Sequence, residues 1–217
     1  MKRFPHGMPG QCWESWLDDL PKLSSFTVRR CLRPSEFGQD TSNQLHHFAD
    51  ASEAGYGCVS YLGSVSDEGK ICRVFLFAKS RVAPLKTISI PRLELSVRHD
   101  NCWKESWRFH LTVKKVFWSD SMSVLRSVKN ETKRFHTFLA NRVSVIRDGS
   151  TSSQWQFVDG STNPGDLASR SLSAETLLSS KQWLMGPEFL WRPEADWPQN
   201  PVSFGNIPVE DHEMKSD

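Results

Sequence analysis

Three strand-like runs that follow one another from residue 45, with only short turns between them, constrain the fold more than any other feature of the chain. The runs cover residues 45–50, 56–63 and 71–78, and glycines stand in both intervening turns. Such short turns join antiparallel neighbours, because parallel strands need a long crossover connection. The three runs therefore predict an antiparallel three-stranded sheet.

Beyond residue 90 the sequence predicts helices that alternate with two further strands. Pro91, and Asn163 followed by Pro164, mark helix starts, since an asparagine cap and an early proline are both favoured there. Gly149 is expected to cap the helix before it. Helices are expected over 91–110, 121–128, 135–147, from 164 and over 174–183, and strands over 113–120 and 154–158. This order, β-β-β-α-β-α-α-β-α followed by a final helix, predicts an α/β fold: a mixed five-stranded sheet, with three antiparallel strands and then two parallel ones, covered by helices.

Composition divides the chain into three parts. Residues 1–44 are rich in proline, serine and charge and are interpreted as an N-terminal leader or linker, residues 45–183 as the folded domain, and residues 184–217 as an acidic extension containing proline and tryptophan. The tryptophans of the extension are expected to pack onto the domain rather than to stack on bases. No run of about 18 apolar residues is present, and none follows the first ten residues, so we expect no membrane span, no secretory signal and an intracellular location in cytoplasm or nucleus.

The five cysteines carry no zinc signature. Their number is odd and no two are spaced as CxxC, so a disulfide framework and a zinc knuckle are both unexpected. Cys58 and Cys72 lie within apolar strand-like runs and are predicted to be buried free thiols.

The formal net charge of +2 conceals an uneven distribution. Residues 70–92 carry six basic side chains and no acid, and residues 126–147 carry six basic side chains against Glu131 alone. The tail from Met185 has seven acids against two basic residues. Two basic segments within a neutral chain favour a polyanionic partner, although an ordinary solvated surface accounts for the charge equally well.

Four acidic residues occupy positions where strands end or helices begin. Asp50 and Asp120 end the first and fourth predicted strands, and Glu94 and Asp166 lie in the first turns of two helices. In this topology the first and fourth strands are expected to be neighbours at the centre of the sheet, so that their ends and the two helix starts can converge at one edge. Singly, each acid is explained by a turn or a helix end, but four together repel one another unless cations neutralise them. Their oxygens suit two Mg²⁺ or Mn²⁺ ions, which at a separation of about 3.5–4 Å can promote hydrolysis of a phosphodiester bond.

Ordered blocks of sequence lie between residues 47 and 191, within a resemblance that covers Trp13 to Pro198. They are HFADAS (47–52), AGYG (54–57), AKSRVAPLK (78–86), IPRLEL (90–95), FWSDS (117–121), RFHTF (134–138), ANRV (140–143), NPGD (163–166), ASR (168–170), GP (186–187) and FLW (189–191). With these blocks the chain resembles the ribonuclease H region of the polyprotein of BEL/Pao-type long-terminal-repeat retrotransposons.

This resemblance implies a ribonuclease H-like fold in which Asp50, Glu94, Asp120 and Asp166 bind two Mg²⁺ or Mn²⁺ ions and form the catalytic set. It implies an endonuclease that cleaves the RNA strand of an RNA–DNA hybrid, which it recognises by contacts with 2′-hydroxyls. A reverse-transcriptase domain is a candidate partner, with residues 1–44 on its side of the chain. Basic side chains would hold phosphates without reading sequence, and those expected to do so are Lys79, Arg81, Lys86, Lys133, Arg134 and Arg142.

Three departures from the family pattern keep an alternative open. The helix after Glu94 is about one turn shorter and polar over residues 98–101, NPGD replaces the usual NPAD, and neither reverse-transcriptase nor integrase segments are expected beside the domain. The alternative is an inactive retroelement relic that folds and binds nucleic acid or a protein partner. An integrase or transposase is disfavoured, because its acids usually run Asp, Asp, Glu. His136 is interpreted either as a helix-surface side chain or as a group assisting proton transfer or product release.

Overall fold

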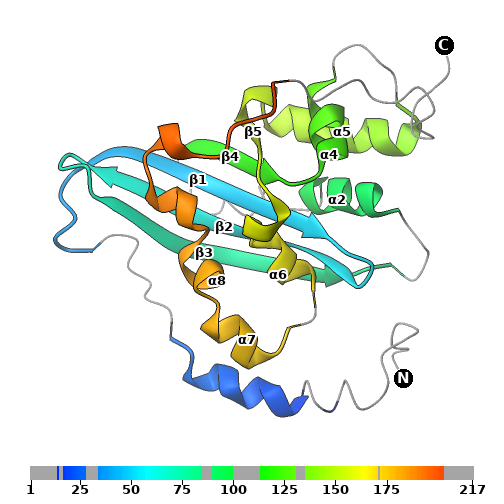
Figure 1. Cartoon of the computed structure of the whole chain (residues 1–217). Coiled ribbons are helices and arrows are strands. Elements are labelled where there is room, and N and C mark those ends of the chain that lie inside the picture. Colours follow the sequence, from blue (N-terminus) through cyan, green and yellow to red (C-terminus); the bar gives the residue numbers. More distant parts are fainter. Residues whose placement is uncertain are drawn as a thin grey trace.

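The computed structural model describes residue 14 and residues 17–27, 34–84, 89–99, 113–130, 135–170 and 172–202, which form one sheet with helices on both faces (Figure 1). The strands are β1 (Asp40–Ala51), β2 (Gly55–Ser66), β3 (Ile71–Val82), β4 (Lys114–Ser119) and β5 (Trp155–Phe157). The α-helices are α2 (Ile90–His99), α4 (Met122–Lys129), α5 (Thr137–Gly149), α6 (Gly165–Ser169), α7 (Ala174–Ser179) and α8 (Lys181–Met185). Short 3₁₀ helices are η1 (Leu20–Ser25), η3 (Ser152–Gln154), η4 (Gly160–Thr162), η5 (Glu188–Trp191) and η6 (Glu194–Asp196).

The five strands lie in the order β3-β2-β1-β4-β5. β1 pairs antiparallel with β2, and β2 with β3, whereas β4 runs parallel to both β1 and β5. The predicted α/β fold is therefore confirmed, including its three antiparallel and two parallel strands and the placing of the first and fourth strands side by side. The parallel register aligns Phe48 of β1 with Trp118 of β4, so both strands end at the same edge of the sheet.

Several element boundaries differ from the prediction for physical reasons. β1 begins at Asp40, because residues 42–44 pair with residues 63–65 of β2. The helix expected over 174–183 is interrupted at Ser180, whose hydroxyl accepts the N–H of Trp183 and caps α8. The helix expected over 91–110 is seen as α2 as far as His99, and residues 100–112 lie outside the described ranges. None of the helices within those ranges is both long and apolar enough to span a bilayer.

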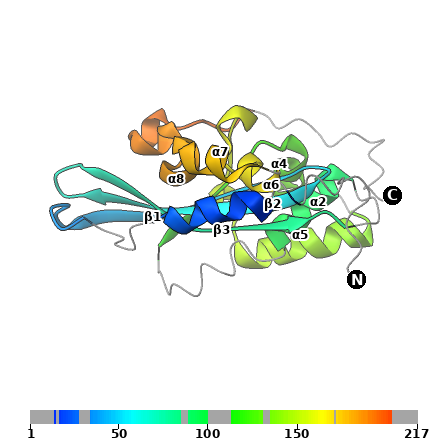
Figure 2. The same ribbon diagram turned by 90° about the horizontal axis from the view of Figure 1, so that it is seen from below.

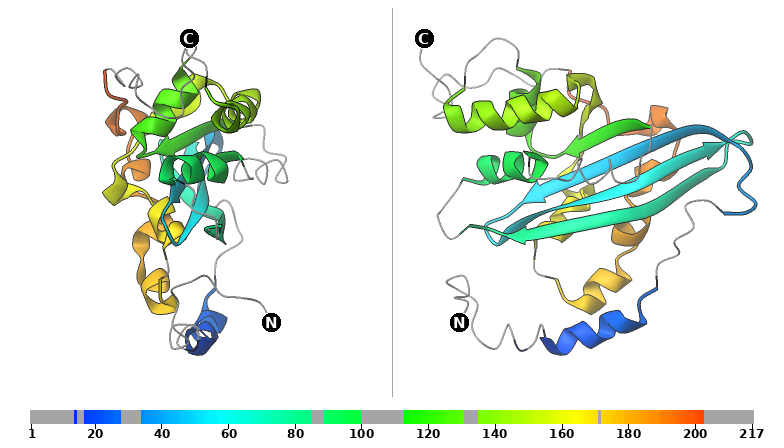
Figure 3. Two further views of the ribbon diagram at one scale, coloured as in Figure 1. Left: turned by 90° about the vertical axis from the view of Figure 1, so that its right-hand side faces the viewer. Right: turned by 180° about the vertical axis from the view of Figure 1, so that it is seen from behind.

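Side chains of β1 alternate between cores on opposite faces of the sheet. Phe48 packs with Trp118 in a core that includes residues of α6, α8 and the segment after α8. Ala49 and Ala51 pack instead with Leu93 of α2, and the core of α4 and α5 includes Leu95 of the same helix. Figures 2 and 3 show α7 and α8 on one side of the sheet and α5 on the other. Asp50 shares the Phe48 face by alternation, and this is the face that α6 covers.

Within the described ranges, most tryptophans are core residues, and those after residue 182 pack onto the domain as expected. Trp118 and Trp155 are buried in β4 and β5. Trp183 and Trp197 join Phe48 in one core, so residues on both sides of position 184 pack onto the same face of the sheet. At the other end of the chain, η1 lies against α7, where the Asp19 carboxylate accepts the backbone N–H of Ala174 (Figure 1).

The cysteines only partly follow the prediction. Cys72 is a half-buried free cysteine on β3. Cys58 of β2 is buried but disulfide-bonded, so the prediction of a free thiol at this position is wrong. An odd cysteine count and the lack of a CxxC motif argue against a framework of bridges, but they cannot exclude a single one.

Candidate acidic active site

Three of the four predicted acids come together at one edge of the sheet. Asp50 and Asp120 each stand two residues beyond the register pair that aligns β1 with β4, so they lie side by side at the strand ends. Asp166 is in the first turn of α6, which crosses β1 and β2. The chain after β5 also approaches the site, since a Cβ on Gly160 would stand 3.2 Å from Oδ2 of Asp120.

The residues that enter α6 are tied to β1 by Asn163. Its side-chain nitrogen donates to the carbonyl oxygen of Ala49 at 3.4 Å, and its Oδ1 accepts the backbone N–H of Gly165 at 3.0 Å. The N-cap of α6 is Pro164, one residue later than the Asn163 cap that the sequence predicts, and the Asn163 side chain holds the residue before the helix start to β1. A Cβ on Gly165 would lie 2.8 Å from the carbonyl carbon of Ala49, so the glycine of NPGD permits the close seating of α6 on β1.

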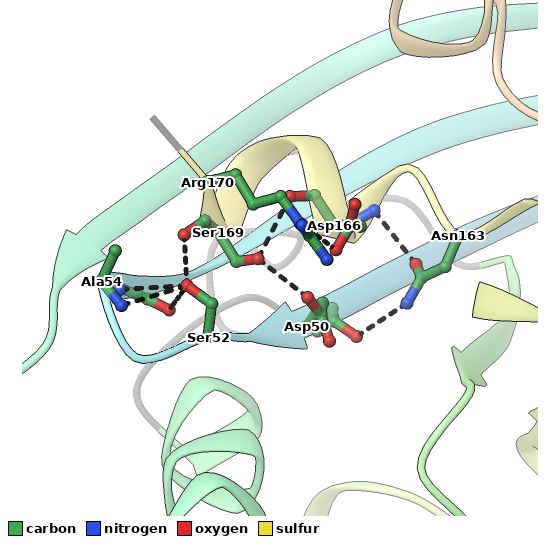
Figure 4. Close-up of polar contacts among 10 residues, drawn as sticks. Asp50, Ser52, Ala54, Asn163, Asp166, Ser169 and Arg170 are labelled. Carbon is green, nitrogen blue, oxygen red and sulfur yellow. Dashed lines mark hydrogen bonds and ion pairs between the residues drawn. The ribbon is translucent and has the colours of Figure 1, made fainter. Parts of the chain in front are cut away.

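Ser169, in the last turn of α6, reaches back to Asp50 (Figure 4). Its hydroxyl donates to Oδ2 of Asp50 at 2.8 Å and also lies 3.1 Å from the carbonyl oxygen of Asp166. The backbone oxygen of Ser169 in turn accepts the hydroxyl of Ser52 at 2.8 Å, in the turn that follows β1. Ser169 is 4% exposed, so this bridge between α6 and β1 is shielded from solvent.

Arg170, the next residue, forms an ion pair with Asp166. Nε of Arg170 lies 2.6 Å from Oδ1 of Asp166, one helical turn away, and the two side chains are 64% and 33% exposed. The hydrogen bond and charge of Asp166, followed by the charge of Asp50, raise the pKa of Arg170. Arg170 is therefore a cation within the electrostatic reach of two of the predicted acids (Figure 4).

The electrostatics of Asp50 reflect its half-buried position among other acids. Burial raises the pKa of Asp50, because desolvation disfavours the ionised carboxylate. The hydrogen bond from Ser169 lowers that pKa, whereas the negative charges of Asp120 and Asp166 raise it. The net shift of the pKa is upward, so the ionised Asp50 carboxylate destabilises the folded, metal-free protein.

Glu94 approaches the site from the other face of the sheet. The residue before it, Leu93, is 3% exposed and packs against Ala49 and Ala51, which flank Asp50 in β1. Glu94 itself is half-buried. Charge interactions link Asp50 to Asp120 and to Asp166, whereas α2, which carries Glu94, packs on β1 through Leu93 on the other face of the sheet.

The donor set fits a hard divalent cation, because it offers carboxylate oxygens and the negative charges of Asp120 and Asp166 act on Asp50. Within the described ranges, however, no three side chains of the types His, Cys, Asp and Glu are close enough to hold a metal ion as they stand. The ion pair of Asp166 with Arg170 is consistent with this, since it directs one carboxylate toward a cation of the protein itself.

The family model for the Pao retrotransposon-like RNaseH-like domain matches residues 8–121, just over half of the 217 residues. The chain belongs to this family. The match covers Asp50, Glu94 and Asp120, whereas Asp166 lies beyond it. The resemblance drawn from the ordered sequence blocks is thereby confirmed.

Two solved structures illustrate what this Pao-family chain is similar to. The N-terminal RNase H domain of Rv2228c from Mycobacterium tuberculosis, solved as a fusion with maltose-binding protein, shares 13% identity over 58% of this chain and 91% of its own, with a TM-score of 0.42. RNase H1 from the halophilic archaeon Halobacterium salinarum NRC-1 shares 12% identity over 64% of this chain and 99% of its own, with a TM-score of 0.40. No curated protein matches the sequence.

Only some of the basic residues predicted to hold phosphates lie within the described part of this Pao-family domain. Lys79 and Arg81 lie near the end of β3, in register with Cys58 and Tyr56 and thus on the α2 face at the acidic end of the sheet. Arg142 donates from Nε to the hydroxyl of Ser96 at 2.9 Å and so links α5 to α2. Three further predicted residues lie outside the described ranges: Lys86, Lys133 and Arg134. His136 is exposed at the N-cap of α5.

Sequence reasoning assigned no role to Ser169 or Arg170. The available signal was their spacing, because residues three and four positions after Asp166 lie on the same helix face as the acid. The bond from Ser169 to Asp50 could not be read from spacing, since it joins residues 119 positions apart.

Proposed function

We propose that this chain is a metal-dependent endonuclease of ribonuclease H type that cleaves the RNA strand of RNA–DNA hybrids. The observation that carries the proposal is the grouping of Asp50, Asp120 and Asp166 at one sheet edge, from three separate elements, in a chain of the Pao family. Carboxylates that repel one another in this way need a cation for neutrality, and a phosphodiesterase of this kind uses that cation.

The residues that would hold two Mg²⁺ or Mn²⁺ ions are Asp50, Glu94, Asp120 and Asp166. When bound, such ions supply an activated water and stabilise the leaving oxygen of the phosphodiester. The chain itself orients the carboxylates: Ser169 donates to Asp50, and Asn163 anchors the start of α6 on β1. The pKa of Asp50 is raised chiefly by burial and also by the neighbouring acids, so a cation bound there would stabilise its ionised form.

Hybrid binding would use the basic side chains near the acidic edge. Lys79 and Arg81 are best placed for this in the described part of the chain, because β3 ends beside the turn that joins β1 to β2. Lys86, Lys133, Arg134 and Arg142 complete the proposed set. Contacts with phosphates position the duplex, and contacts with 2′-hydroxyls select the RNA strand.

A reverse-transcriptase domain is the proposed protein partner on the N-terminal side. The described part of residues 1–44 exposes three large apolar side chains around η1, Leu17, Leu23 and Phe26. Apolar side chains gathered on one short element support a contact with another domain.

The test is a cleavage assay on an RNA–DNA hybrid with Mg²⁺ or Mn²⁺. Asp120→Asn keeps the shape of the side chain but removes its charge, so we expect this variant to lose activity. Glu175→Gln, at an exposed position on α7, is the matched control and should cut as the wild type does. DNA duplex and RNA duplex of the same sequence report the substrate class.

The alternative function is an inactive retroelement relic that binds nucleic acid or protein. It is favoured by the absence, within the described ranges, of a preformed group of three metal ligands. A wild type that binds the hybrid but is as inactive as Asp120→Asn would establish this alternative and overturn the nuclease proposal.

A further inference from the structure

The last turn of α6 contacts two of the acids through consecutive residues. Ser169 donates to Asp50, and Arg170 pairs with Asp166. The two contacts differ in kind, because one is a buried hydrogen bond between neighbouring elements and the other is a partly exposed ion pair within one helix. Figure 4 shows both side chains directed toward the acids.

Ser169 restricts the orientation of Asp50. Its hydroxyl is held from two sides, by Oδ2 of Asp50 and by the carbonyl oxygen of Asp166, and its own carbonyl is anchored by Ser52. Oδ2 of Asp50 is thus engaged by Ser169, and the same carboxylate also accepts a hydrogen bond from the backbone of Ala51. A partner that orients a ligand in this way typically contributes about 10–100-fold to metal affinity.

Arg170, in contrast to Ser169, should lower the affinity of the site for a metal ion. It places a permanent positive charge 2.6 Å from the Asp166 carboxylate and within reach of the charge of Asp50. A divalent cation that uses Asp166 must displace this guanidinium, or bind against its repulsion. At 64% exposure the Arg170 side chain is free to swing into solvent when the ion pair breaks.

We propose that the last turn of α6 prepares the acidic site for a divalent cation: Ser169 is a positioning residue for Asp50, while Arg170 is a resident counter-ion of Asp166 that the incoming cation displaces. This inference rests on the proposed function, because it concerns the same acids. It assigns adjacent residues opposite effects on one measurable quantity, the affinity for the cation.

The experiment is calorimetric titration of the full chain with Mn²⁺ and with Mg²⁺, without nucleic acid. Ser169→Ala should bind the ion about tenfold more weakly, and Ser169→Thr, which keeps the hydroxyl, should recover much of the loss. Arg170→Gln should bind it about two- to fivefold more tightly, because a competing cation is removed. The gain in Arg170→Gln should shrink at high salt, whereas the loss in Ser169→Ala should persist.

Matched controls come from similar contacts elsewhere in the chain. Arg192 forms an ion pair with Glu188 at the same helical spacing as Arg170 with Asp166, and Ser127 is a buried helix serine that donates to the carbonyl of Ser123. Arg192→Gln and Ser127→Ala should leave the affinity unchanged. The Nε–H resonance of Arg170 provides a direct readout, since it should be protected from exchange in the metal-free protein and should lose this protection when Mg²⁺ is added.

The outcomes separate this inference from the proposed function. If the wild type binds the ion but Arg170→Gln binds it no more tightly, or Ser169→Ala no more weakly, the inference fails and the nuclease proposal stands. If the wild type binds neither Mn²⁺ nor Mg²⁺, both fail together.

Discussion

Gly57 of β2 lies directly beneath Ala168 of α6, so closely that a Cβ on Gly57 would stand 2.5 Å from the Cβ of Ala168. The same added atom would lie 2.6 Å from the carbonyl oxygen of Ala168, where no flexible side chain can move aside. Because α6 carries Asp166 and Ser169, and Arg170 follows directly after it, the distance of α6 from the sheet determines how closely these side chains approach Asp50. The glycine thus links the packing of one helix to the geometry of the acidic site.

Gly57→Ala should therefore disturb both stability and the site. The added methyl must push α6 away from β2, at a cost of about 1–3 kcal/mol in the free energy of unfolding. The bond from Ser169 to Asp50 should lengthen with it, so divalent-ion affinity should also fall. Denaturant unfolding and calorimetric titration measure the two effects.

Ser80→Ala is the control for this substitution, because Ser80 is exposed on β3 in register with Gly57. It should change neither quantity. An unfolding midpoint for Gly57→Ala equal to that of the wild type would show that α6 is not seated as closely as described.

Asp50→Asn should stabilise the metal-free protein at neutral pH. The folded-state pKa of Asp50 is raised, chiefly by burial, so the folded protein favours the protonated carboxyl and loses stability as pH rises through that pKa. Asparagine removes the charge, and its Oδ1 can still accept the hydroxyl of Ser169. We expect thermal unfolding in EDTA to move upward by a few degrees, while divalent-ion binding is lost.

Glu36→Gln, at an exposed turn before β1, should leave the melting temperature unchanged and serves as the control. A lower melting temperature for Asp50→Asn in EDTA would contradict the reading of Asp50 as a strained carboxylate. In the same experiment with Mg²⁺, the wild type should have the higher melting temperature, since only the wild type gains stability from the ion.

Two adjacent buried histidines predict that the protein loses stability in mild acid. His46 accepts the indole N–H of Trp118 at its Nδ1, and His47 bonds the Ser60 hydroxyl at 2.7 Å and stacks on Phe117. Burial lowers the pKa of His47 to about 3 and that of His46 well below its ordinary value. Both rings therefore stay neutral in the folded state under conditions that protonate the unfolded chain.

The sign follows from the protons bound by each state. Above the ordinary histidine pKa neither state binds a proton, and below it only the unfolded state does, so stability falls as pH falls toward about 3 for His47. The loss between about pH 7 and about pH 5 is roughly 2 kcal/mol for each histidine. His47→Asn should therefore reduce the loss of unfolding free energy between about pH 7 and about pH 5 by the contribution of one histidine.

The strands and their order could be predicted because alternation and short turns are local signals. The start of β1 could not, since residues 42–44 are strand only through their pairing with residues 63–65. The break at Ser180 was missed because the helical pattern continues across it, while its hydroxyl caps the next helix.

The same contrast holds for the acidic site. Asp50 and Asp120 stand at strand ends, where topology alone brings them together. The contact of Ser169 with Asp50, by contrast, depends on how α6 crosses β1, and so on the missing side chains of Gly57 and Gly165. Glycine is visible in a sequence, but the close approach that it permits is a property of the folded chain.

Trp197→Ala tests whether residues after α8 are part of the domain core. Trp197 is 8% exposed, its ring lies 5.1 Å from His46 and 5.9 Å from Trp118 between centroids, and its Nε1 donates to the carbonyl of Arg192. Truncating a buried tryptophan costs about 3–5 kcal/mol, a large share of a typical domain's stability. Trp191→Ala, a half-buried tryptophan six residues earlier, should cost clearly less. Equal unfolding midpoints for the two variants in urea would show instead that this segment packs only weakly on the surface. Trp197 would then not contribute to the core around Phe48.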